Sequence, residues 1–219
     1  MNLAEYVWDI ISLSFILFIL SLLELEALGY GALKIYNQYT PLLALAICIV
    51  FHELAHLIPL ALTGYKLKMG IAKLGFLPVI YIDIKGPISK NIYVLVALSP
   101  ILLLQPALLL LANQGFFKEV FKLAFIMNQA SSAGDLIFTS AALKLPPGRL
   151  IRDTGSILLV DLPKPYGKTT SLLIKLIALA LFILILTNLL IQRYSFLLKY
   201  KSILLKPKDL TGRLCYLAY

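Results

Sequence analysis

The chain has only two histidines, His52 and His56, which stand four residues apart in the sequence HELAH, and Glu53 directly follows the first. In a helix, residues i and i+4 lie on one face about 5–6 Å apart, so both imidazoles can reach one metal ion. Neutral imidazole binds Zn²⁺ well, and zinc lowers the pKa of a bound water to about 7. We therefore predict one zinc ion held by His52 and His56, with Glu53 as the catalytic base.

A catalytic zinc site needs a third protein ligand and an open position for water. No histidine remains, so an acid should supply the ligand, and Asp135 fits best because it lies on a polar stripe of an otherwise apolar predicted helix. The stripe consists of Asn128, Ser131, Ser132, Asp135 and Thr139. Such a stripe faces other helices, not lipid. Asn128 is a candidate for orienting a ligand or holding a substrate carbonyl. Plain helix packing remains open for Asn128, as does a capping role for Asp135.

Composition places these residues in a membrane. Hydrophobic residues make up 60% of the 219 residues and charged residues 14%, whereas soluble domains have about 45–50% and about 25%. The net charge is +9, but Lys and Arg occupy connecting segments and the C-terminal tail, so no nucleic-acid partner is predicted.

Cys48 and Cys215 lie far apart and predict no disulfide framework. Cys48, one turn before His52, is predicted to be a small buried side chain and not a ligand.

A window of about 19 residues predicts five transmembrane helices, at residues 8–28, 41–63, 91–113, 118–143 and 171–191. Pro100 and Pro106 predict a kink or break in the third. The alternation in VIYIDIK predicts a β-hairpin across 66–85, and RDTGS predicts a second at 149–162. The expected fold is an all-α polytopic membrane protein with short β-hairpins at one membrane face. Residues 1–191 form one membrane-embedded domain, and 192–219 form a basic tail on anionic lipid.

This topology brings the site residues to similar depths. The second and fourth helices run in the same direction, and Glu53 and Asp135 differ in depth by about 3 Å at 1.5 Å per residue. Segments 64–90 and 144–170 share one side of the membrane. Lys and Arg are divided almost equally between the two sides, so charge alone predicts no orientation.

An HExxH motif in a membrane helix, followed by an aspartate on a later one, resembles the site-2 protease class of intramembrane zinc peptidases. That class has Asn-Pro followed by Leu-Asp-Gly, whereas Asn128 to Asp135 contain no proline and Gly134 precedes the aspartate. The chain is more similar to a smaller family of membrane zincin peptidases, with HExxH, a later helix containing Gly-Asp and a short strand-rich segment. The likeness covers residues 41–162.

The resemblance implies that His52, His56 and Asp135 bind zinc and that Glu53 is the catalytic base. It also implies a multi-pass cell-membrane protein with its active site toward the cytosolic face. We therefore predict a zinc metalloendopeptidase that cleaves a membrane-protein or peptide substrate, held by strand addition to the 66–85 hairpin. No oligomeric state is predicted. Two alternatives use the same ligands: a membrane metal transporter or sensor, and a non-catalytic membrane scaffold.

Overall fold

The computed structural model describes nine stretches of the chain: 3–35, 37–65, 67–74, 77–84, 86–115, 117–151, 153–156, 159–160 and 162–204. The chain forms two compact units, Met1–Ala178 and Leu179–Tyr219, and each is considered by itself. From residue 205 onward the predicted basic tail, with Cys215, lies outside the described residues.

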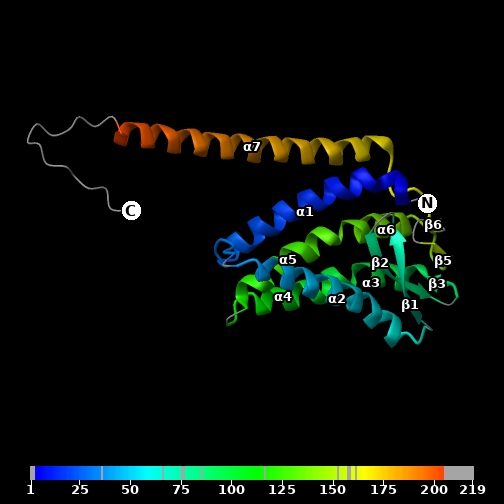
Figure 1. Cartoon of the computed structure of the whole chain (residues 1–219). Helices are drawn as coiled ribbons and strands as arrows, with labels where there is room; N and C mark the ends of the chain where they lie inside the picture. The colour runs from blue at the N-terminus through cyan, green and yellow to red at the C-terminus, as the bar shows by residue number, and fades with distance from the viewer. Residues whose placement is uncertain are drawn as a thin grey trace, which may run out of the picture. The chain divides into compact units, whose positions relative to one another are not determined.

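Helices account for most of the described chain (Figure 1). They are η1 (Leu3–Tyr6), α1 (Val7–Ala27), α2 (Tyr39–Leu62), α3 (Lys90–Ser99), η2 (Pro100–Leu104), α4 (Gln105–Leu111), α5 (Lys118–Ser131), α6 (Ala133–Leu143) and α7 (Lys168–Leu204). Four helical segments of the described chain are long and apolar enough to cross a membrane: α1, α2, Lys90–Leu111 and Lys168–Ser195. The third of these combines α3, η2 and α4, in which η2 is a π-helical turn that begins at Pro100.

The predicted membrane helix at 118–143 is two shorter helices, α5 and α6, which meet at Ser132. The backbone N–H of Ser132 donates to Asn128 O at 3.1 Å, and the hydroxyls of Ser131 and Ser132 donate to the same carbonyl oxygen at 2.9 Å each. Hydroxyls that bond back to a helix carbonyl commonly bend the helix. A hydropathy average over about 19 residues does not detect this break, because the break depends on hydrogen bonds made by two individual serines.

In the part of the chain that the structure describes, three short antiparallel strand pairs lie between the helices. β1 (Leu67–Leu74) pairs with β2 (Leu77–Ile84), in the range where the first hairpin was predicted. In the second predicted range, β5 (Asp153–Ser156) pairs with β6 (Leu159–Val160). The sequence did not predict the third pair, in which β3 (Ile88–Ser89) meets β4 (Leu150–Ile151). This long-range pair ties the start of α3 to the segment that follows α6.

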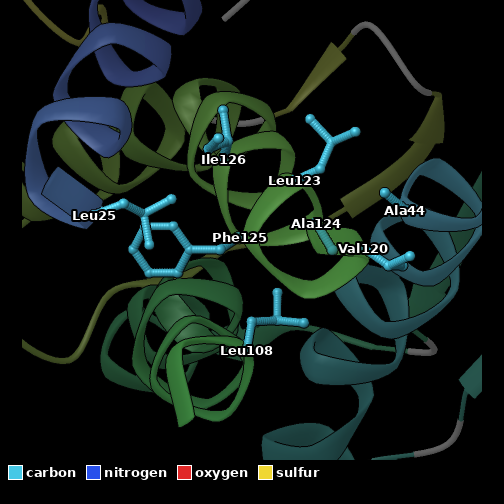
Figure 2. Close-up of a cluster of buried hydrophobic side chains, with 8 residues drawn as sticks. All are labelled: Leu25, Ala44, Leu108, Val120, Leu123, Ala124, Phe125 and Ile126. Carbon is cyan, nitrogen blue, oxygen red and sulfur yellow. The ribbon is translucent and has the colours of Figure 1, made fainter. Parts of the chain in front are cut away.

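Two clusters of buried apolar side chains hold the helices around the middle of α2. The first joins α1, α2, α4 and α5 and is drawn in Figure 2; it consists of Leu25, Ala44, Leu108, Val120, Leu123, Ala124, Phe125 and Ile126. The second joins the end of α2 to α6 and the β3–β4 pair; it consists of Leu60, Ile88, Ala141, Ala142, Ile151 and Leu162. Along α2 and along α5–α6, the predicted site residues fall between these clusters. Packing on both sides therefore fixes their backbones.

A buried carboxylate ties α1 to the first turns of α7. Asp9 is 2% exposed and accepts hydrogen bonds from Tyr166 at 3.1 Å and Ser171 at 2.8 Å. Lys175 pairs with the same carboxylate at 2.9 Å. Burial of the Tyr166 hydroxyl, helped by the negative charge of Asp9, raises the pKa of Tyr166. The negative charge of Asp9 is thus balanced by Lys175 and by two hydroxyl donors, and none of these groups belongs to the histidine site.

Candidate metal centre

Both histidines lie on the part of α2 that is covered by other helices. His52 is buried and His56 is partly buried, and their ring centroids are 5.0 Å apart with an angle of 84° between the planes. This is the spacing expected for residues i and i+4. Cys48, one turn earlier, is 4% exposed and lies outside the group of possible metal ligands. The structure therefore shows Cys48 as a small buried side chain outside that group.

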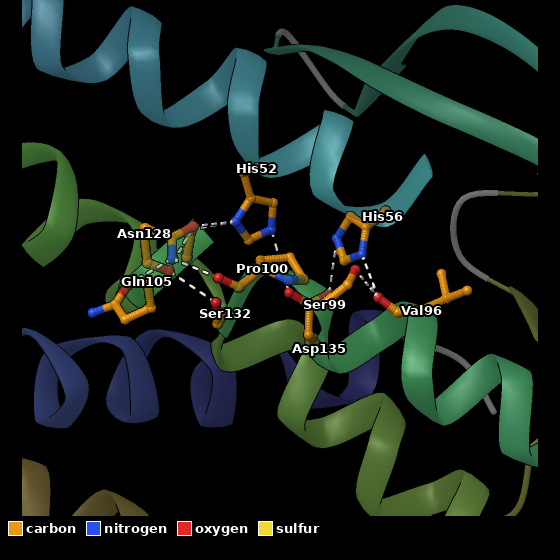
Figure 3. A network of polar contacts seen from close by, with 10 residues as sticks. His52, His56, Val96, Ser99, Pro100, Gln105, Asn128, Ser132 and Asp135 are labelled. Carbon is orange, nitrogen blue, oxygen red and sulfur yellow. Dashed lines mark hydrogen bonds and ion pairs between the residues drawn. The ribbon is translucent and has the colours of Figure 1, made fainter. Parts of the chain in front are cut away.

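Asp135, in the first turn of α6, faces both imidazoles across the gap between α2 and α6 (Figure 3). His52 Nε2 is 3.3 Å from Asp135 Oδ2, and His56 Nε2 is 3.6 Å from Asp135 Oδ1. One donor atom from each residue lies within 4.8 Å of the others. Among the described residues, this is the only such group of three or more histidine, cysteine or acidic side chains.

The hydrogen bonds around Asn128 determine which nitrogen of His52 carries a proton. Asn128 Nδ2 lies 3.1 Å from Pro100 O and 2.7 Å from Gln105 Oε1, two acceptors, so the amide oxygen must face the imidazole. Asn128 Oδ1 is 2.9 Å from His52 Nδ1, which therefore donates. The Ser131 hydroxyl gives its hydrogen to Asn128 O, so its oxygen, 3.2 Å from the same Nδ1, is a second acceptor.

His56 is held in the same way by a backbone group. Its Nδ1 lies 2.8 Å from Val96 O, and a carbonyl oxygen can only accept, so His56 Nδ1 also carries its proton. Each imidazole thus uses Nδ1–H to bond the surrounding helices and directs Nε2 toward Asp135. A histidine that binds a metal almost always donates its other ring N–H to a carbonyl, carboxylate or water.

The donor set fits a zinc ion. Ligand atoms about 2.0–2.2 Å from a tetrahedral zinc lie about 3.3–3.6 Å from one another, which is the range of the two nitrogen–oxygen distances given above. Asp135 Oδ2 is buried, and despite its 3.3 Å approach to His52 Nε2 it has no hydrogen-bond partner among the described residues. An unpaired buried carboxylate oxygen costs free energy unless a cation or proton compensates it. Two nitrogens and a carboxylate that converge in this way suit a divalent cation.

Glu53 lies beside this group. It follows His52 on α2, is partly buried, and interacts electrostatically with both histidines and with Asp135. Glu53 is not one of the three residues whose ligand atoms converge. A carboxylate next to a metal site, and not tied up in the ligand set, is available to accept a proton from water.

The structure brings His52, His56 and Asp135 together, as the sequence analysis expected. Asn128 is hydrogen-bonded to His52, and Glu53 follows His52 on α2. Of the other polar-stripe residues, Ser131 contacts His52, whereas the hydroxyl of Thr139 is buried with no hydrogen-bond partner in the described part of the chain. The sequence analysis did not predict Val96 O or Gln105. Gln105 could have been noticed as a polar residue in an apolar helix, one position before Pro106; a backbone acceptor leaves no such signal.

Comparisons with known proteins agree with this chemistry. Residues 45–150 match the model of the family described as "Putative zincin peptidase", and this segment contains every residue of the site. The chain is also 27% identical over 153 residues to a protein of Pyrococcus woesei, "Uncharacterized 24.7 kDa protein in gap 5'region", and the match covers 68% of each chain. No solved structure matches the chain. The similarity to zincin peptidases suggests metallopeptidase activity and implies zinc as the metal.

Proposed function

We propose that this protein is an intramembrane zinc metalloprotease, related to site-2 proteases, that hydrolyses peptide bonds of membrane-associated substrates. One observation carries the proposal: the Nε2 atoms of His52 and His56 converge on the Asp135 carboxylate, while both Nδ1–H groups are bonded outward. Four helices of a length and hydropathy suited to a bilayer support the membrane setting. The match of residues 45–150 to zincin peptidases supports the reaction class.

In this proposal His52, His56 and Asp135 bind one zinc ion. When bound, zinc would polarise the scissile carbonyl and make a water molecule acidic enough to lose a proton near neutral pH. Glu53 accepts the proton of the attacking water and delivers it to the leaving amine. Asn128 and Val96 O hold the imidazoles in the orientation that leaves each Nε2 lone pair available.

The substrate segment must be unwound, because backbone groups within a helix are already hydrogen-bonded to one another. The β1–β2 hairpin offers an antiparallel pair to which an extended segment could add as a third strand. We propose that the hairpin holds the substrate in this way, with the site toward the cytosolic face of the cell membrane. A proline at residue 80 or 82 should then reduce cleavage and leave zinc binding intact; unchanged cleavage would discard the strand-addition step.

The test of the reaction is Glu53→Gln in proteoliposomes, with a library of membrane-anchored peptides as substrate and mass spectrometry to detect cleavage. Loss of a general base should lower cleavage by about 10²–10⁴-fold with bound zinc unchanged. Glu24→Gln, an exposed acid on α1, is the matched control. Full cleavage by Glu53→Gln would contradict the proposal. Absence of cleavage combined with zinc uptake into vesicles would favour the metal-transporter alternative.

A further inference from the structure

The broken helix Lys90–Leu111 supplies no ligand to the candidate metal centre. It does supply Val96 O, which is hydrogen-bonded to His56, and Gln105, which is hydrogen-bonded to the Asn128 side chain beside His52. Pro100 lies one helical turn after Val96, at the position whose backbone N–H would normally donate to Val96 O. Proline has no N–H. Val96 O is therefore left without its helical partner, and it accepts instead from His56 Nδ1 at 2.8 Å and from the Ser99 hydroxyl at 2.6 Å.

The same helix controls the other imidazole through Gln105, the first residue of α4. Gln105 Nε2 donates to Phe125 O at 3.3 Å and to Gln129 Oε1 at 2.8 Å, so both of its amide hydrogens are used. Its oxygen must then face Asn128 Nδ2, which lies 2.7 Å away. Gln105 is 9% exposed and Asn128 is 0% exposed, so water has little access to replace either bond.

The two arrangements have the same result. A side chain or backbone group of Lys90–Leu111 sets an acceptor opposite Nδ1 of each histidine, directly for His56 and through Asn128 for His52. Figure 3 shows two sets of contacts, one joining His56 to Val96 and one joining His52 through Asn128 to Gln105. Asn128 Nδ2 also donates to Pro100 O at 3.1 Å, so the second set includes the carbonyl group of Pro100. The missing N–H of Pro100 bears on Val96 O and so on His56, whereas the amide of Gln105 bears on Asn128 and so on His52.

We propose that Pro100 and Gln105 are positioning residues, which fix the Nδ1–H groups of His56 and His52 respectively and so direct both Nε2 atoms toward Asp135. The proposal rests on the proposed zinc site only for its effect on zinc affinity. The hydrogen bonds themselves exist without metal. In this account, the proline that interrupts the membrane helix frees a carbonyl oxygen that orients His56.

The experiment uses Pro100→Ala and Gln105→Met in the full chain, with ¹⁵N-labelled histidine. Because the chain has two histidines, two Nδ1–H signals are expected with or without zinc. Pro100→Ala adds an N–H that competes for Val96 O and keeps the carbonyl oxygen that Asn128 contacts, so it should shift mainly the His56 signal. Gln105→Met should shift mainly the His52 signal. Zinc affinity, measured by competition with a chromophoric chelator, should fall about tenfold in each variant, the lower end for outer-sphere partners of metal-bound histidine.

Matched controls separate positioning from folding. Pro106→Ala makes the same change in the same helix away from Val96, and Gln114→Met makes the same side-chain change at an exposed residue; both should keep affinity within about threefold. The alanine of Pro100→Ala restores a helical N–H donor, so the thermal unfolding midpoint of this variant should not fall. If the methionine variant does not fold, Gln105→Glu replaces it in the experiment. This variant keeps an acceptor opposite Asn128, so the His52 signal should be unchanged.

Three results would overturn the proposal: unchanged histidine signals in the two variants, equal shifts of both signals in either variant, or an affinity loss in Pro106→Ala as large as in Pro100→Ala. A wild-type protein that binds no zinc would instead refute the proposed function. The Nδ1–H signals of the metal-free protein would still decide whether Pro100 and Gln105 hold the imidazoles.

Discussion

The α5–α6 helices and the part of α7 that follows Ala178 both contain apolar runs for which a membrane helix was predicted, at 118–143 and 171–191, but their amide side chains have partners in different places. On α7, Thr187 donates to Ile183 O and Gln192 donates to Asn188, each within one turn of its own helix. On α5, Asn128 bonds His52, Pro100 and Gln105, which belong to other helices. The candidate site is thus built on an amide whose partners come from other helices.

Exposure follows the same division. Leu184 and Leu190 on α7 are 66% and 58% exposed, whereas Phe125, Ile126 and Asn128 on α5 are fully buried. Mean hydropathy indicates how readily a segment partitions into lipid. The segment Lys168–Ser195 of α7 has the highest mean hydropathy of the four candidate membrane helices, 2.6. It does not report which side chains must meet across helices. The comparison predicts that the same substitution has different effects in the two regions.

Leucine truncation should give the largest difference. Leu108→Ala removes a side chain that is 2% exposed from the cluster around Phe125 and should lower the free energy of unfolding by about 2–5 kcal/mol. Leu184→Ala removes an exposed side chain and should change the free energy of unfolding by less than about 0.5 kcal/mol. Thermal or denaturant unfolding in the same detergent measures both. Equal losses would remove the distinction between the two regions.

Asparagine truncation should give the next largest effect, on zinc affinity. Asn128→Ala removes one acceptor of His52 Nδ1–H and leaves the Ser131 hydroxyl, so affinity should fall about tenfold, the lower end for such partners. Asn188→Ala, on α7, should leave zinc affinity unchanged. Chelator competition on the two purified variants checks this. A similar decrease in both would mean that the loss at Asn128 reflects general destabilisation.

The smallest expected effect concerns the end of α6. Lys90 Nζ, on α3, donates to the carbonyl oxygens of Leu143 at 2.9 Å and Leu145 at 2.5 Å. A cation at a helix C-terminus stabilises it, so Lys90→Met should lower the free energy of unfolding by about 1 kcal/mol. Lys118→Met, an exposed residue at the start of α5, should have no such cost. If Lys90→Met is as stable as wild type, this tie between α3 and α6 contributes nothing measurable.

Local patterns in the sequence predicted much of the fold. Continuous apolar runs predicted the regions of α1, α2 and α7, and helical spacing predicted that the two histidines share a face. Pro100 predicted an interruption of the third helix, which the structure has as η2. The break at Ser132 was not predicted, because it depends on hydroxyls that compete for one carbonyl oxygen. The β3–β4 pair was also missed, since its strands are two residues each and far apart in sequence.

The candidate site could be predicted where residue type alone limits the chemistry. Histidine and aspartate inside apolar helices are costly, so His52, His56 and Asp135 stood out. The oxygen of Val96 and the amide of Gln105 did not, because every residue has a carbonyl and a single glutamine has many structural uses. Their roles follow from contacts between helices, and sequence periodicity does not specify those contacts.

The central claim is that His52, His56 and Asp135 bind one zinc ion together. Metal analysis of the purified protein, by mass spectrometry after dialysis against a weak chelator, tests it most directly. Wild type and the control Asp9→Asn should each retain about one zinc per chain, whereas His56→Ala and Asp135→Ala should retain almost none, since a structural or catalytic zinc site needs at least three protein ligands. A wild type without zinc, or Asp135→Ala with its full complement, would contradict the account.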